Sequence, residues 1–218
     1  MSSKAYIVPS DFVTPANQDN YRVKALAAGI QRGYNLGIQS WDKIEMPLPA
    51  DPATPTIPEK NALIKWLAAG NWPRNLDARE FQPNLDAAVG AAVDFWNTAP
   101  LIGALGTEYS CLGATAVAAA ANRIKKIVVF FSVQIITSPL PVNRLLFRRN
   151  NATGLLQSEF DLEQLATMQR VAGFFSEPVV WDNNTAYAVN AASCIATGVA
   201  CKLILGNIVL EPAGTTNV

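Results

Sequence analysis

The sequence contains no histidine in 218 residues, and this absence excludes more chemistry than any other feature of the chain. Histidine is the usual proton shuttle near neutral pH and the commonest metal ligand in proteins. Without it, most hydrolase triads and most zinc or iron centres have no basis here. We therefore expect a structural protein and not an enzyme, with no catalytic residue, metal or cofactor.

Charge is also scarce. Only 16% of the residues are charged and 50% are hydrophobic, whereas about 25% of a typical soluble domain is charged. A surface with so few charges leaves apolar area for partners to cover, which favours a homo-oligomer or lattice over a monomer. The 17 basic and 17 acidic residues cancel, which excludes a polybasic or polyacidic character for the whole molecule.

The basic residues are nevertheless concentrated. No acidic residue lies between Glu108 and Glu159, and this stretch supplies a candidate phosphate-facing patch: Arg123, Lys125, Lys126, Arg144, Arg148 and Arg149. Several cations together neutralise phosphates of nucleic acid or lipid head groups. A solvated sheet edge, or pairing with acids of another subunit, is the favoured reading of the same residues.

Cysteines, long apolar runs and a leader are missing or sparse as well. Three cysteines are too few for a disulfide framework, and we expect them to stay reduced. The nearest approach to the ~18 apolar residues of a spanning helix is 127–136, which we predict to be a buried strand. The first residues lack the apolar core of a signal peptide, so we expect a protein made in the cytoplasm.

Residues 1–20 contain Pro9 and Pro15 and show no sustained periodicity, which predicts an extended arm. Its apolar side chains are candidate contacts to neighbouring subunits: Tyr6, Ile7, Phe12 and Val13. A short helix is predicted at 21–28, capped by Asn20. The glycines that follow at intervals of four are interpreted as bends, with a small-residue packing face as the alternative. Five prolines between residues 46 and 58 indicate a stiff connection outside any sheet.

Three further helices are predicted before residue 126. Pro58 and Gly70 bound a helix over 59–69 that buries Leu63 and Trp66. A second helix is expected from residue 84 or 85 to 96, with its apolar residues on one face. The alanine-rich run 112–121 is a candidate for the third, but Gly113 and Thr115 leave that assignment open.

From residue 126 the pattern changes to strands separated by short turns. The predicted strands are 126–137, 142–149, 158–165, 178–181, 185–194 and 201–210. In the third, strict alternation places Phe160 and Leu162 inward, while Glu159, Asp161 and Glu163 point to water or to a neighbour.

The expected fold is mainly β with helical additions: an antiparallel β-sandwich or jelly roll in the C-terminal part, and helices and an extended arm in the N-terminal half. We expect the divisions 1–57, 58–125 and 126–218, with one single domain as the alternative.

Three other sets of residues could carry chemistry, but for each an ordinary structural role is the better explanation. Ser40 and Lys43 have the spacing of serine acyl-enzymes, but the companion motifs are absent. Glu159, Asp161 and Glu163 share a strand face, yet carboxylates about 7 Å apart are too splayed to cage calcium alone. The five tryptophans are better explained as core residues than as a sugar-binding cleft.

The segments Phe-Phe-Ser-Glu-Pro-Val-Val-Trp (174–181) and Leu-Ile-Leu-Gly-Asn-Ile-Val-Leu-Glu-Pro (203–212) resemble the sheet ends of jelly-roll viral and phage capsid (coat) proteins. The tailless icosahedral phages with internal membranes are one group with such subunits. The resemblance implies a virion coat subunit that assembles in many copies with itself and other virion subunits. It also implies that the N-terminal arm and proline-rich segment tie neighbours together. A carbohydrate-binding or adhesion module is the alternative, and an enzyme comes third.

Overall fold

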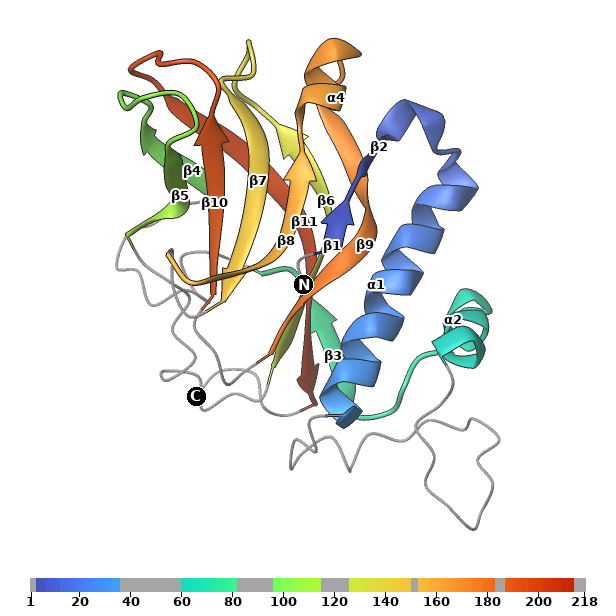
Figure 1. Ribbon diagram of the computed structural model, residues 1–218. Coiled ribbons are helices and arrows are strands. Elements are labelled where there is room, and N and C mark those ends of the chain that lie inside the picture. The colour runs from blue at the N-terminus through green and yellow to red at the C-terminus, as the bar shows by residue number, and fades with distance from the viewer. Residues whose placement is uncertain are drawn as a thin grey trace.

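The computed structural model describes residues 3–35, 60–81, 96–114, 126–149, 153–182 and 187–213. This part of the chain is mainly β, with two largely antiparallel sheets and few helices (Figure 1). The helices are α1 (Pro15–Asn35), α2 (Lys60–Ala68) and α4 (Glu163–Thr167), with one 3-10 turn, η1 (Ser10–Phe12).

We name the two sheets A and B. Sheet A has the order β1 (Ser3–Ala5), β8 (Leu155–Asp161), β7 (Val142–Arg149), β10 (Tyr187–Ser193) and β5 (Glu108–Ala114). Sheet B has the order β4 (Trp96–Pro100), β11 (Ala200–Pro212), β6 (Ile127–Ile135), β9 (Ala172–Trp181) and β2 (Ile7–Pro9), and β3 (Leu76–Arg79) also pairs with β11. One parallel pairing, between Asn97 and Leu112, joins β4 to β5 at the edge.

The pairings from β4 to β11 are nested. β7 pairs with β8, β6 with β9, β5 with β10 and β4 with β11. The chain therefore runs as one long hairpin in which successive pairs lie alternately in sheet A and sheet B. Two further pairings, β10 with β7 in sheet A and β11 with β6 in sheet B, join the two nested pairs within each sheet.

The main core lies between the two sheets and is rich in aromatic rings. Phe147 of sheet A meets Phe130 and Trp181 of sheet B, with ring centroids 5.3 Å and 6.1 Å apart. Phe160 stacks on Phe175 at 4.0 Å between centroids. Burying a large side chain of this kind stabilises a fold by roughly 1.5–3 kcal/mol, so this layer dominates the packing energy.

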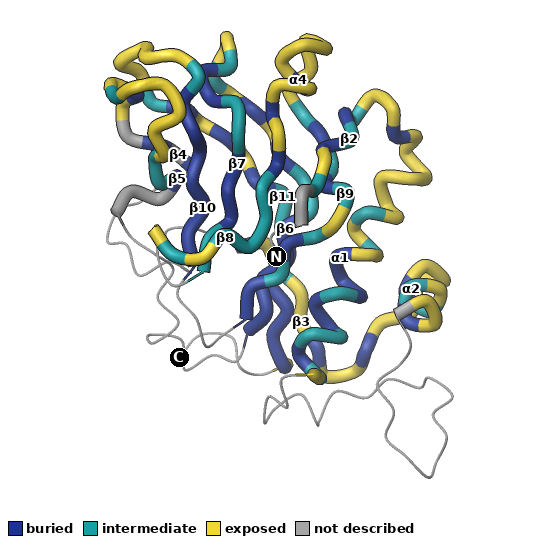
Figure 2. The backbone as a smooth tube through the Cα atoms, viewed as in Figure 1, coloured by how far each residue is buried: buried dark blue, intermediate teal, exposed yellow. Residues whose placement is uncertain are grey.

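Helix α1 covers the outer face of sheet B, and α2 packs beside it (Figures 1 and 2). The helix comes very close to the sheet at Gly29. A Cβ there would lie 2.6 Å from Leu210 Cδ1 and 2.7 Å from Val129 Cγ2. Leu63 and Leu67 of α2 complete this second cluster.

The expected 21–28 helix is too short, because α1 has 21 residues and runs through both Gly29 and Gly33. The prediction of bends at these two glycines is therefore wrong. The alternative interpretation, a small-residue packing face, agrees with Gly29, which lies directly against β6 and β11. Helix α1 also begins earlier, at Pro15, whose fixed φ suits the first helical position.

The extended arm at 1–20 is also corrected. β1 pairs in parallel with β8, and β2 pairs with β9, so residues 3–9 are edge strands of the chain's own sheets. Residues 15–20 belong to α1. Three-residue strands are too short to show a period, and their pairing partners lie more than 150 residues away.

Two segments that were expected to be helical also contain strands. Trp96 begins β4 instead of ending a helix, and residues 112–114 belong to β5. The remainder of both expected helices, and the proline-rich segment, lie outside the described residues. Strands from the first half thus join both sheets, so the N-terminal half is not only helices and an arm.

The third predicted strand is partly wrong. β8 ends at Asp161, and α4 follows at Glu163–Thr167, where we expected no helix. Asp161 Oδ1 accepts a hydrogen bond from the Glu163 backbone N–H at 2.8 Å, which closes the turn into the helix. The inward positions of Phe160 and Leu162 are confirmed, because both are fully buried.

The bounds of the remaining strands and of α2 are confirmed to within a few residues, except that β9 begins six residues earlier than expected. In α2, Leu63 is buried as predicted, but Trp66 is only partly buried. The predicted bounds of β7, 142–149, agree with the structure at both ends. Gly70 follows α2 with φ +82°, the left-handed conformation typical of a helix end.

We expect Leu63→Ala to lower the free energy of unfolding by about 2–5 kcal/mol, because its side chain is fully buried between α2 and its neighbours. Chemical denaturation followed by circular dichroism measures this loss. Lys65→Ala, on an exposed position of the same helix, is the control. A loss below 1 kcal/mol for Leu63→Ala would contradict the packing described.

Two adjacent residues test whether the N-terminal segment belongs to this chain's own core. Ile7 is 1% exposed and Tyr6 is 62% exposed. We expect Ile7→Ala to cost about 2–5 kcal/mol of unfolding free energy, and Tyr6→Ala to cost little. Equal, small losses would mean that the segment only rests against the sheets.

Candidate functional surfaces

Three of the six residues of the predicted basic patch lie on β7, and each contacts a carboxylate from elsewhere in the chain. Arg144 and Arg148 are on the outer face of sheet A, whereas Arg149 is on the inward side of β7, paired in register with buried Tyr187. Arg148 binds Glu108 through two hydrogen bonds, from Nε at 2.8 Å and from Nη2 at 2.6 Å. Asn190 on β10 donates to the same carboxylate at 3.0 Å. Two parallel bonds of this kind are the strong form of an arginine–carboxylate pair.

The other two arginines have similar partners. Arg144 Nη1 lies 3.3 Å from Glu159 Oε1 on the neighbouring strand β8. Arg149 Nη2 lies 3.6 Å from Asp182 Oδ2, which also binds Arg32 of α1 at 2.6 Å. The Arg149 guanidinium also sits 5.7 Å from the centroid of the Tyr187 ring.

The acids missing from residues 109–158 are therefore supplied by Glu108 of β5, Glu159 of β8 and Asp182, which follows β9. A phosphate would have to compete with these carboxylates for the arginines. Lys126 is buried, while Arg123 and Lys125 lie outside the described residues. Phosphate binding by this set stays a prediction.

The four candidate arm contacts divide into two kinds. Ile7 and Val13 are buried in this chain, at 1% and 7% exposure, whereas Tyr6 and Phe12 are more than 60% exposed. Only the two aromatic side chains of this set are accessible at the surface of the chain.

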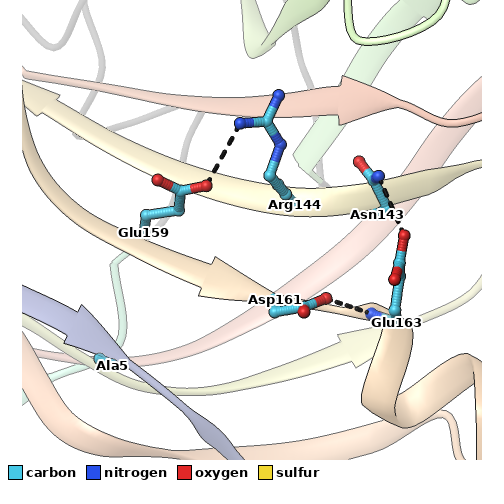
Figure 3. A pocket seen from close by; sticks show the side chains of 6 residues that line it. All are labelled: Ala5, Asn143, Arg144, Glu159, Asp161 and Glu163. Atoms are coloured by element: carbon cyan, nitrogen blue, oxygen red, sulfur yellow. Dashed lines mark hydrogen bonds and ion pairs between the residues drawn. The ribbon is translucent and has the colours of Figure 1, made fainter.

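The three carboxylates predicted to share a strand face line a cavity of about 210 Å³ together with Ala5, Asn143 and Arg144 (Figure 3). Glu159 faces Arg144, and Glu163 accepts a hydrogen bond from Asn143 at 3.2 Å. Asp161 accepts from the Glu163 backbone. Protein donors thus occupy each carboxylate, and no group of metal ligands is found among the described residues.

The three cysteines are free thiols. Burial is the main reason that the pKa of Cys201 rises to about 11, and it raises the pKa of Cys111 and Cys194 as well. A raised pKa keeps a thiol protonated at neutral pH, and the thiol form is a poor nucleophile.

One end of the two sheets is unusually apolar. The loops 101–107, 136–141 and 194–199 meet there, at the upper end in Figure 1, and we call them together the apolar loop end. None of the three contains a charged residue. Their tips expose large aliphatic side chains: Ile102 78%, Leu105 70%, Val199 57%, Ile136 44% and Ile195 41%.

Backbone hydrogen bonds tie these loops into one surface. Leu101 N–H donates to the Val199 carbonyl at 3.2 Å, and Gly198 N–H donates to the Leu101 carbonyl at 3.1 Å. Cys194 N–H donates to the Pro141 carbonyl at 2.9 Å, which joins the third loop. In Figure 2 most residues of these loops have the colour of exposed residues.

Sequence reasoning missed the apolar loop end. The sequence did contain a signal for it. Ile, Leu and Val are uncommon in turns, and these three turns contain them without any charged residue. The sequence alone does not bring three segments up to 98 residues apart to one end of the fold.

Comparisons with protein-family models, curated proteins and solved structures found no match for this chain. Among the described residues, no helix has both the length and the apolar character to cross a membrane.

The Glu108–Arg148 pair should make the stability of the fold depend on pH. Burial opposes ionisation of Glu108, but hydrogen bonds from Arg148 and Asn190 outweigh it and lower the pKa of the carboxyl. Because the pKa is lower in the folded state than in the unfolded state, ionised Glu108 stabilises the fold at any pH above the unfolded-state pKa of about 4.3. This stabilisation is lost as the pH falls through the folded-state pKa.

We therefore expect Glu108→Gln to be less stable than the wild type at pH 7, by on the order of 1 kcal/mol, and equally stable once acid protonates Glu108. Denaturation curves from pH 7 to pH 2 measure the difference. In an Arg148→Gln background the substitution should matter less. A difference that does not change with pH would contradict the pairing.

Proposed function

We propose that this protein is a virion structural protein, a capsid subunit that assembles in many copies into a viral or phage shell. The observation that carries the proposal is the nested strand pairing of β4 to β11. A long hairpin wound so that successive pairs alternate between two sheets is the connectivity of a jelly roll. This supports the finer fold assignment as well as the resemblance to coat proteins.

Jelly rolls serve as capsid domains, lectins and cupins, so the surface must decide among them. A cupin places its ligand between the sheets, where this chain packs aromatic rings. A lectin presents exposed aromatic side chains to sugars. Trp96 and Trp181 are instead buried, and the indole N–H of Trp72, which is 39% exposed, donates to the Leu76 carbonyl. Tyr6 and Phe12 are exposed, and they are the aromatic side chains that a lectin role would have to use.

The surface suits repeated contacts with other proteins. Charge is sparse over the whole chain, and the described surface exposes large hydrophobic side chains at several loops and at η1. Paired acids and bases on sheet A leave little net charge to repel a second copy. These features support a multi-copy role in the virion over a monomeric binding module.

Purified full-length protein tests this function. We expect light scattering to report large particles as concentration rises, and negative-stain microscopy to show closed shells of uniform size. A strictly monomeric protein at high concentration would contradict the proposal. Retention on a glycan array by that monomer would favour the carbohydrate-binding alternative.

A further inference from the structure

We infer that the apolar loop end is a contact surface between copies of this chain. The inference rests on the proposed function and names the surface that assembly uses. It starts from exposure: the five aliphatic tips leave on the order of 500 Å² of apolar area in water, as much as the largest patch on an ordinary monomer.

These side chains supply roughly three fifths of the area that one partner buries in a standard interface. A standard protein interface buries about 800 Å² on each partner, with an apolar centre and a polar rim. Lys202 is an exposed polar residue at the rim, where its backbone carbonyl accepts from the Ile136 N–H.

The absence of charge on the loops selects a second copy as the occupant. Two identical charged surfaces repel each other when they meet around a symmetry axis, but two charge-free surfaces do not. An anionic lipid surface would instead be met by clustered lysines and arginines, and the three loops contain none.

The loops are also held in place before any contact forms. Gly106 N–H donates to the Ser193 carbonyl at 2.7 Å, and Thr107 Oγ1 donates to the Ala104 carbonyl at 2.6 Å. Gly106 has φ +80°, a conformation that glycine adopts without strain. A preordered surface loses less conformational entropy on binding than a flexible one.

Leu105→Asp tests the inference, with Leu155→Asp as a matched control. The two leucines are 70% and 72% exposed. Leu155 pairs with Arg149 at the far end of β7 from the loop 136–141, about 20 Å away at the rise of a strand. Thermal unfolding should be the same for both variants, because neither side chain is buried.

In light scattering, we expect Leu105→Asp to raise the protein concentration needed for assembly at least about tenfold, and Leu155→Asp to behave as the wild type. Ile102→Asp, at 78% exposure, should reproduce the loss. If the wild type forms shells and both loop variants form them equally well, the inference is wrong while the proposed function stands. If the wild type stays monomeric, both are wrong.

Vesicle flotation tests whether the apolar loop end binds a lipid membrane instead of a second copy of the chain. With vesicles of phosphatidylcholine, alone or with phosphatidylserine, we expect Leu105→Asp and the wild type to float equally little. Flotation of the wild type that Leu105→Asp abolishes, with assembly unchanged, would overturn the inference in favour of a membrane contact.

Discussion

Phe130 of sheet B and Phe147 of sheet A meet with ring centroids 5.3 Å apart, and this contact between the sheets determines where every other surface lies. Trp181 joins the same cluster at 4.5 Å from Phe130. Because side chains alternate along a strand, directing these rings inward directs their neighbours outward. Arg148 therefore lies on the outer face of sheet A, and Val129 lies under α1 on the outer face of sheet B.

The outer faces of the two sheets differ in what covers them. Sheet B buries its outer side against α1, with Gly29 allowing the close approach. Sheet A instead carries cross-strand ion pairs, of which the bidentate Arg148–Glu108 pair is the best formed. The apolar loop end lies where strands of both sheets end, and among the described residues neither a helix nor an ion pair covers its aliphatic side chains.

Local patterns predicted much of the C-terminal fold. The bounds of β7 follow from Pro141 before it and the break in pattern after Arg149, and the buried positions of Phe160 and Leu162 follow from alternation. The same method could not find β1 and β2, which are three residues long and depend on partners far along the chain. It also interpreted Gly29 as a bend, because close helix–sheet packing is a tertiary effect.

The candidate surfaces were less predictable than the fold, for the same reason. The basic stretch before Glu159 has no nearby acid in sequence, yet Glu108 reaches Arg148 from β5 across the intervening strand β10. The apolar loop end depends on three turns that meet only after nested pairing.

Electron cryo-microscopy of particles formed by the full-length protein measures subunit contacts directly. A shell whose subunits meet through the loops 101–107, 136–141 and 194–199 is the predicted result. Particles in which these three loops face solvent, or a sample with no particles at any concentration, would contradict an assembly role for this end of the fold.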